Sequence, residues 1–265
     1  MENIGNTNTM SPDYVPEDLK VPYDVLELPS QGLLYPNKKS TVKVEYLTAM
    51  DETILTSPNL SQNGKFLSVL LDRKVKDLGF PTEELLEGDR LAILIWLRAT
   101  GYGEIYQQQV YDDKTNDFVV ADINLNELKQ KKLEITPDEN GEFEYRLPNK
   151  GYLVKFKFTT GKDEETIDNI DEERQKRYGS DVSERVMIKL EQQVTEINGE
   201  RDKLNISNIL KRLPILDARH LRKYITDNEP GMDLSVKASI PGGESVDTFL
   251  RFTRDFFWPE LWVLT

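Results

Sequence analysis

The stretch that most constrains the fold is residues 91–100, LAILIWLRAT, where apolar side chains occupy almost every side of a helix. A helix that is apolar all round has to be covered by other elements. Asp89 stands where a side chain can cap the first turn, and Gly101 stands where a left-handed residue commonly ends a helix. We therefore expect a central buried helix in the N-terminal half, with Trp96 in the core.

The residues before this helix predict one strand and two shorter helices. Residues 41–46 alternate apolar and polar side chains, which is typical of a half-buried strand. Thr48 can cap a following helix that Ser57 and Pro58 end. Residues 64–76 repeat apolar side chains along one face and predict a second helix.

The hydrophobic pattern changes from helical to strand-like after Gly103. Four segments then have the pattern of β-strands: residues 104–111, 118–121, 142–147 and 152–159. Turn residues of the Asp, Asn, Gly and Pro types separate them. We expect these strands to form an antiparallel sheet that packs against the preceding helices.

Helices are predicted again from residue 161 onward. Residues 161–179 are acidic early and basic late, which suits the dipole of one helix that ends at Gly179. Another helix is expected to start at Ser180 or Ser183 and to end near Gly199. Its apolar stripe would consist of Val182, Val186, Leu190, Val194 and Ile197.

A further helix and a hairpin close the predicted fold. Asp217 is placed to cap the helix, and Leu216 and Leu221 are placed to pack together across that cap. Residues 233–239 and 246–252 then predict two short strands around a Pro-Gly-Gly turn.

Together these elements predict an α+β protein: N-terminal helices packed with an antiparallel sheet, then a helical region closed by a short C-terminal β-hairpin. We expect an α+β domain at residues 23–160 and a mainly helical domain at residues 161–265 that carries the hairpin and an aromatic tail. Residues 1–22 are polar, Asn-rich and interrupted by prolines, which predicts an extended arm. The arm is either a frayed terminus or a tail that orders along a neighbouring subunit, with Tyr14 and Val15 as anchors.

Two apolar segments are candidates for protein contacts. In the first, Pro29 and Gly32 bracket a turn. Leu33, Leu34 and Tyr35 follow at once and would form the apolar tip of a docking loop. The second segment has five large apolar side chains within seven residues: Phe256, Phe257, Trp258, Leu261 and Trp262. These side chains either cap the C-terminal helical region or dock on a partner.

Composition excludes several kinds of site. The chain has no cysteine, so disulfides, thiolate catalysis and zinc sites with cysteine ligands are excluded. His220 is the only histidine, which leaves no multi-histidine metal site, and no phosphate-binding loop or nucleophile-elbow motif is present. We therefore predict no catalytic, cofactor-binding or metal-binding residues and no small-molecule substrate.

The formal net charge of −13 argues against a general affinity for nucleic acid. A local nucleic-acid contact is a separate hypothesis that would use the basic residues Lys211, Arg212, Arg219, Arg222 and Lys223. No apolar run approaches the roughly 20 residues of a membrane span, and the first residues lack the pattern of a secretory signal. These features predict a protein that is made in the cytosol and that binds other proteins.

Four motifs are spread over residues 27–259: LPSQGLLYP, YLTAMDETIL, GDRLAILIWLRATGYG, and NEPGMDLSV with the later FFWP. Together they resemble the baseplate hub subunit family of T-even-type contractile-tailed bacteriophages. The resemblance implies a non-enzymatic structural component of the tail baseplate, in the hub or inner baseplate of the virion. It also implies that the protein bridges other baseplate and tail proteins, in several copies within a symmetric assembly, and that it is assembled in the host cytoplasm. The alternative is a baseplate assembly chaperone that is absent from the mature virion.

One segment departs from this family pattern. Similar phage proteins often carry a C-x-x-C-G turn between the two C-terminal strands, where this chain has SIPGG at residues 239–243. A metal-stapled ribbon is thereby excluded. The hairpin is instead expected to be held by the packing of Phe249, Phe252 and Phe256.

Overall fold

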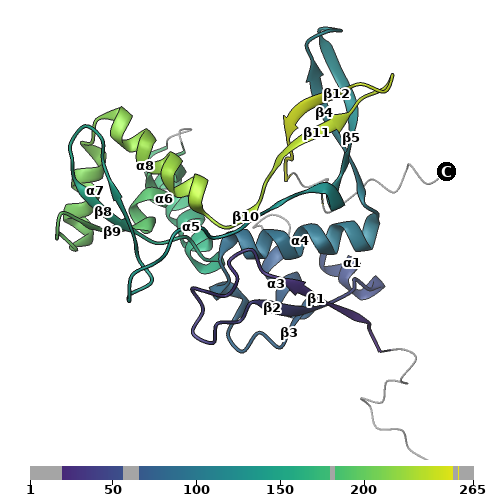
Figure 1. Ribbon diagram of the computed structural model, residues 1–265, viewed down its shortest axis with the longest axis horizontal. Helices are drawn as coiled ribbons and strands as arrows, with labels where there is room; N and C mark the ends of the chain where they lie inside the picture. Colours follow the sequence, from purple (N-terminus) through teal and green to yellow (C-terminus); the bar gives the residue numbers. More distant parts are fainter. Residues whose placement is uncertain (1–19, 56–65, 180–182, 253–255, 257–265) are drawn as a thin grey trace, which may run out of the picture.

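The computed structural model describes residues 20–55, 66–179, 183–252 and 256, and Figure 1 shows how they are arranged. The helices are α1 (Ala49–Leu55), α3 (Phe66–Lys74), α4 (Glu87–Tyr102), α5 (Gly161–Tyr178), α6 (Arg185–Gln193), α7 (Lys203–Lys211) and α8 (Ile215–Asn228), with short 3-10 helices η2 (Thr82–Glu84) and η3 (Leu125–Glu127). The strands are β1 (Tyr23–Glu27), β2 (Thr41–Glu45), β3 (Val75–Lys76), β4 (Ile105–Asp112), β5 (Asp117–Asn124), β6 (Gln130–Lys131), β7 (Phe143–Arg146), β8 (Leu153–Phe156), β9 (Val194–Ile197), β10 (Gly231–Met232), β11 (Ser235–Ser239) and β12 (Ser245–Phe249). This mixture of helices and antiparallel sheets confirms the predicted α+β class.

The central buried helix predicted at residues 91–100 is confirmed as part of α4. Figure 1 shows α4 between the sheet of β1, β2 and β3 on one side and the upright sheet of β4, β5, β11 and β12 on the other. Ile93, Leu94 and Leu97 are buried, and Trp96 packs partly buried against the core. An apolar helix is thus covered by elements from both halves of the chain, as its composition requires.

The two ends of α4 differ from the prediction. Its N-cap position is Leu86, which makes no side-chain cap, whereas Asp89 lies inside the first turn. The helix also continues past Gly101, and Gly103, with φ of 93°, follows its end. A glycine at position 101 instead avoids a clash with a neighbouring side chain, because a Cβ there would lie 2.6 Å from Cδ1 of Leu47.

The strand and helices predicted before α4 are present as β2, α1 and α3. Thr48 lies directly before α1, and its N–H and hydroxyl both donate to the carboxylate of Asp51, at 2.8 Å each. The helix predicted at residues 64–76 is shorter at its end, because β3 follows α3 directly and pairs with β2. Ser57 and Pro58 lie outside the described residues.

The predicted strands belong to two sheets rather than one. The C-terminal hairpin of β11 and β12 joins β5 through the pair Ser239↔Asp122, which gives a four-stranded sheet in the order β12-β11-β5-β4. β7 and β8 instead form a three-stranded sheet with β9. The prediction of a single sheet was wrong because β5 and β8 each pair with a strand that lies far along the chain, and periodicity does not report such pairing.

A second lobe combines the sheet of β7, β8 and β9 with α5, α6, α7 and α8 (Figure 1). This lobe crosses the boundary predicted at residue 160, because β8 precedes that residue and β9 follows it. α5 confirms the helix predicted at residues 161–179. The Thr160 side chain and the Asp163 carboxylate accept each other's backbone N–H in a capping box, and Gly179 ends the helix with φ of 58°.

α6 is shorter than predicted. It ends at Gln193, so Val194 and Ile197, which were expected on its apolar stripe, are buried strand residues of β9. Val186, also expected on the stripe, is exposed, and Val182 lies outside the described residues. Three β-branched residues among the four of β9 favour the strand over a further helical turn.

Asp217 does not cap α8, since the N-cap position is the proline before the helix. The buried Asp217 carboxylate instead accepts the backbone N–H groups of Asn149 and Lys150, at 2.9 and 3.1 Å. It thereby ties the turn between β7 and β8 to the first turn of α8. Leu216 is 54% exposed, so the predicted packing of this side chain on the buried Leu221 was wrong.

The C-terminal hairpin is present around the predicted glycine turn. Gly242 and Gly243 have φ values of 103° and 84°, which other residues rarely adopt. Phe252 and Phe256 pack together with ring centroids 4.8 Å apart, as expected. Phe249 is exposed, so the expectation that it helps to hold the hairpin by packing was wrong.

The two lobes meet at the first turn of α4. The backbone N–H of Glu87 donates to the carbonyl of Thr159 at 3.0 Å, which joins α4 to the segment before α5. Gly88 is required there, because a Cβ on it would lie 1.8 Å from the carbonyl oxygen of Pro230. Three distant parts of the chain are therefore in backbone contact at this junction.

Acidic side chains gather at the same junction. Glu164 of α5 forms an ion pair with Lys189 of α6 at 2.7 Å. Burial raises the pKa of Glu87 to about 7, while Arg90 lowers it and Glu164 raises it further. Burial also raises the pKa of Glu229. Both carboxyl groups therefore bind their protons more tightly in the folded chain than in the unfolded one.

Replacing Glu87 by glutamine is expected to stabilise the protein more at alkaline than at acidic pH. A carboxyl group whose pKa is higher in the folded than in the unfolded state binds its proton more tightly when folded. The wild type therefore loses stability as the pH rises from about 4.5 to about 7, whereas the variant lacks this loss. Urea unfolding at about pH 5 and about pH 8 measures the difference. Glu139→Gln, in an exposed turn, is the control. A difference in the free energy of unfolding between wild type and Glu87→Gln that stays constant with pH would contradict this expectation, and so would an equal effect of the control.

Candidate protein interface

The loop between β1 and β2 is built from consecutive turns, as its proline and glycine predict. The backbone N–H of Gln31 donates to the carbonyl of Leu28 at 2.8 Å, and similar bonds follow along the loop. Gly32 has φ of 69°, and a Cβ on it would lie 2.4 Å from the backbone of Lys39. The loop therefore folds back closely on the residues that lead into β2.

Asp89 of α4 holds this loop on the core. Its carboxylate accepts hydrogen bonds from the backbone N–H of Ser30 at 2.9 Å and from the hydroxyls of Ser30 and Tyr35 at 2.5 Å each. The Tyr35 oxygen in turn accepts the backbone N–H of Leu86 at 2.9 Å. Burial raises the pKa of Asp89, whereas the hydrogen bonds from Ser30 and Tyr35 lower it. All of these groups are buried, so the network stabilises the fold.

The structure corrects the placement of Tyr35 at the tip of a docking loop. Its side chain is only 4% exposed, and its ring lies 4.8 Å from the ring of Phe80. Leu34 is partly buried against the core, whereas Leu33 is 42% exposed. Leu33 is thus the side chain of the predicted tip that is most open to a partner.

Phe256 is also a core residue and not a surface contact. Its ring lies 5.0 Å from the ring of Tyr106, and its side chain is fully buried. Nε of Arg98 donates to the carbonyl of Phe256 at 2.6 Å. Phe256 therefore packs against α4 and β4, not against the C-terminal helical region that was expected to receive it.

The other predicted contact residues belong to segments outside the described part of the chain. They are Tyr14, Val15, Phe257, Trp258, Leu261 and Trp262. Their role as contact residues stays a prediction.

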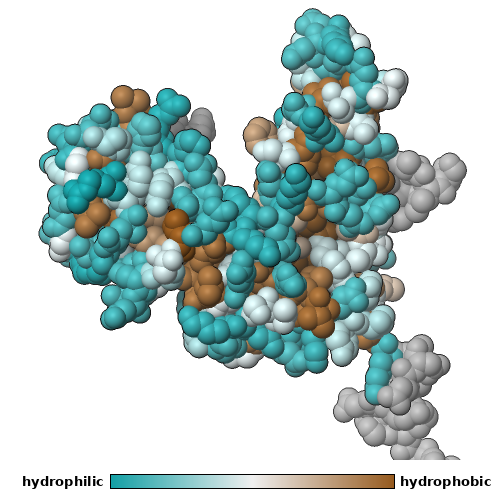
Figure 2. Space-filling model, in the orientation of Figure 1, coloured by the Kyte–Doolittle hydropathy of each residue, from teal (hydrophilic) through white to brown (hydrophobic). Residues whose placement is uncertain are grey.

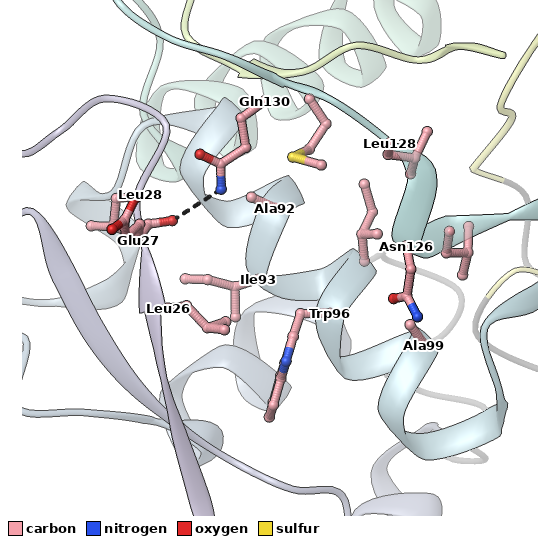
Figure 3. Close-up of a pocket in the computed structure, with 13 residues that line it drawn as sticks. Leu26, Glu27, Leu28, Ala92, Ile93, Trp96, Ala99, Asn126, Leu128 and Gln130 are labelled. Carbon is pink, nitrogen blue, oxygen red and sulfur yellow. Dashed lines mark hydrogen bonds between the residues drawn. The ribbon is translucent and has the colours of Figure 1, made fainter.

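An apolar groove, which sequence patterns did not indicate, lies between β1, α4 and residues 125–130 (Figure 3). Its volume is about 190 Å³. Leu26, Ile93, Trp96 and Leu128 are among the apolar side chains that line it. Nε2 of Gln130 donates to the carbonyl of Glu27 across the groove at 3.4 Å (Figure 3). No local signal marks this site, because its walls come from three separate segments.

The outer face of the four-stranded sheet carries a second set of apolar side chains. Tyr111 of β4 and Phe118 of β5 are opposite each other in register, with ring centroids 5.4 Å apart. Phe118 is 64% exposed, and Val120 on the same face of β5 is also exposed. Figure 2 shows hydrophobic surface on the upright sheet and between the lobes, whereas the outer surface of the second lobe is mainly hydrophilic.

Two of the five basic residues of the nucleic-acid hypothesis, Lys211 and Lys223, have acidic neighbours. Lys211 forms an ion pair with Glu191 at 3.2 Å, and Lys223 forms one with Asp227 at 2.7 Å. His220 is an exposed residue of α8. Partial neutralisation of these cations weakens the case for a phosphate-binding surface.

Neither a metal site nor a membrane span is found in the described residues. Within residues 20–55, 66–179 and 183–252, no cluster of three or more metal-ligating side chains has a suitable arrangement for an ion. Over the same ranges, none of the helices combines the length and the apolar character needed to cross a bilayer.

A family model links the chain to known proteins. The model described as T4 bacteriophage base plate protein matches residues 25–258, which is most of the chain. Neither the search of curated proteins nor that of solved structures found a match to the chain. The matched range contains α4, the groove and the four-stranded sheet. The chain therefore belongs to the T4 bacteriophage base plate protein family and is a structural protein of a phage tail baseplate.

Proposed function

We propose that this baseplate protein bridges neighbouring tail proteins in the hub or inner baseplate, as a virion component and not as an enzyme. The observation that carries the proposal is the apolar outer face of β4 and β5, where Phe118 is exposed beside Tyr111 and Val120. Exposed clusters of large apolar side chains are typical of protein contacts. Family membership indicates the kind of partner, namely other phage tail proteins.

A bridging protein needs two contact surfaces that are far enough apart to reach two neighbours. Figure 1 shows the turn between β4 and β5 at the far end of the upright sheet, while the loop between β1 and β2 lies on the opposite side of α4. Leu33 is exposed on that loop, and Asp89 fixes the loop through buried hydrogen bonds. The apolar face of β4 and β5 and the exposed Leu33 side chain therefore support contacts with two different neighbours. The arm with Tyr14 and Val15 is a further proposed contact.

Replacing Phe118 by serine is expected to leave the isolated protein folded, because the side chain is exposed in the free chain. Its incorporation into phage particles is expected to fall by roughly tenfold or more, because large aromatic side chains carry much of the binding energy of an interface. Leu33→Ser is expected to act in the same way through the other surface. Quantitative mass spectrometry of purified particles measures the incorporated amount.

Val186→Ser is the matched control, since it removes an exposed apolar side chain from α6 in the second lobe. Normal incorporation of both the Phe118 and the Leu33 variant would show that the bridging role is wrong. Absence of the wild-type chain from purified particles would instead indicate the alternative, an assembly chaperone.

A further inference from the structure

We propose that the apolar groove between β1 and α4 binds residues 257–265 of a second copy of this chain, which add as a strand to the open edge of β1. The inference goes beyond the bridging role and does not depend on the contacts at Leu33 and Phe118. It follows from the open backbone edge, the lining of the groove, the sequence after Phe256, and the place where that segment starts.

Among the described residues, β1 has an open edge, because it is the first strand of a sheet with the order β1-β2-β3. The N–H of Leu28 donates toward β2, to the carbonyl of Ser40 at 2.8 Å. Backbone groups of an antiparallel strand alternate between its two sides, so those of Val25 and Glu27 point to the open side. The long hydrogen bond from Gln130 reaches the Glu27 carbonyl from this side. An incoming strand can replace that bond with backbone hydrogen bonds.

The groove beside this edge is suited to apolar side chains. Figure 3 shows Leu26 and Ile93 on one side of it and Leu128 on the other, with Ala92 between them. Ala92 and Ala99 are small, which leaves space above α4. In strand addition, backbone hydrogen bonds supply affinity and pockets for alternate side chains supply specificity. The edge and the groove together provide both parts.

The segment at residues 257–265, FWPELWVLT, ends in an apolar run, LWVLT, that suits a strand and follows Pro259 and Glu260. Its aromatic and β-branched side chains favour strands. Because successive side chains of a strand point to opposite sides, Trp262 and Leu264 would share one side and enter the groove together. Such a dense apolar run is unfavourable in water and requires a cover.

The start of this segment favours a second copy over the chain's own groove. Phe256 is fixed by burial and by the hydrogen bond from Arg98. The groove residues Ala92, Trp96 and Ala99 lie within about 60° of one another around α4. Arg98 lies about 120° from their centre, so a segment that starts there would have to pass around α4 to reach its own groove. A segment that binds the groove of a second copy does not have to pass around its own α4. Because each copy offers one segment and one groove, the resulting contact is head-to-tail.

Two variants test the proposal by complementation. Ala92→Arg fills the groove, and the double replacement Trp262→Ser with Leu264→Ser removes from the segment the two apolar side chains that would enter it. The wild type is expected to self-associate in analytical ultracentrifugation, and each variant is expected to associate roughly a hundredfold more weakly. An equimolar mixture of the two variants is expected to form dimers, because one variant keeps its segment and the other keeps its groove.

Hydrogen exchange at the amides of Val25 and Glu27 provides an independent measurement. Their exchange is expected to slow in the wild type and in the mixture, relative to either variant alone. Ala49→Arg, at an exposed position of α1, is the control and is expected to associate like the wild type.

A monomeric wild type would overturn the proposal in two distinguishable ways. If the amides of Val25 and Glu27 are then protected from exchange, the segment binds the groove of its own chain. If they are not protected, the segment does not bind the groove, and another protein is the candidate occupant. A mixture that stays monomeric would overturn the proposal as well. None of these measurements uses phage particles, so their outcome is separate from that of the bridging role.

Discussion

Replacing Asp89 by alanine is expected to lower the free energy of unfolding by about 3 kcal/mol. The carboxylate is the common acceptor for the N–H and hydroxyl of Ser30 and for the hydroxyl of Tyr35. All three donors are buried, so its removal leaves them without that acceptor in a place that water does not reach. The loop between β1 and β2 is then expected to detach from α4 before the rest of the lobe unfolds.

Denaturant unfolding measures this loss, with Asp113→Ala in the exposed turn after β4 as the matched control. Tyr35→Phe is a milder version of the same change. It removes one donor to Asp89 and the acceptor of the Leu86 N–H, and it is expected to cost about 1–2 kcal/mol. Equal stabilities of the Asp89 and Asp113 variants would show that the network contributes little.

Residues close together in the sequence predicted local structure well. α4 was predicted because its apolar side chains are continuous, and α5 because its charges follow the helix dipole and a glycine ends it. The resemblance to phage baseplate proteins is confirmed by the family match. For each helix the information lies within one segment of the chain, and for the resemblance it lies within four short motifs.

Interactions between distant residues could not be predicted in this way. Asp89 and Asp217 each stand near a helix start, where an acidic residue usually serves as a cap. Both instead accept hydrogen bonds from distant loops, at Ser30 and at Asn149. The sequence pattern of a cap and that of a long-range buried acceptor are the same, so only the fold distinguishes them.

The candidate interface shows the same limit. Leu33 and Tyr35 stand two residues apart in one apolar run, yet one is exposed and the other is in the core. What separates them is the hydrogen bond from Tyr35 to Asp89, which lies in another element. The groove beside β1 was missed for a related reason, because its walls come from β1, α4 and the segment after β5.

Replacing Lys74 by methionine is expected to destabilise the protein by about 3 kcal/mol. Lys74 and Asp51 form an ion pair at 2.5 Å, and their side chains are only 3% and 0% exposed. Burial alone would raise the pKa of Asp51, but hydrogen bonds from Lys74, Thr48 and Arg73 hold it below its usual value. Methionine keeps the apolar stem but leaves a buried carboxylate without its main counter-charge. Lys76→Met is the matched control, because Lys76 pairs with Glu45 at the surface and exposed pairs contribute under about 1 kcal/mol.

Two further measurements separate the ion pair from the packing of Lys74. Combining Lys74→Met with Asp51→Ala is expected to cost less than the sum of the two single replacements, because the second change removes the carboxylate that the first leaves unpaired. A lowered carboxyl pKa gives stability that is present above the ordinary pKa and is lost as the pH falls through the lowered one. The difference in the free energy of unfolding between the wild type and Lys74→Met is therefore expected to become smaller toward about pH 3, as measured by denaturant unfolding. If the stability losses of the two replacements simply add, and if the difference between wild type and Lys74→Met does not change with pH, the loss comes from packing and not from charge.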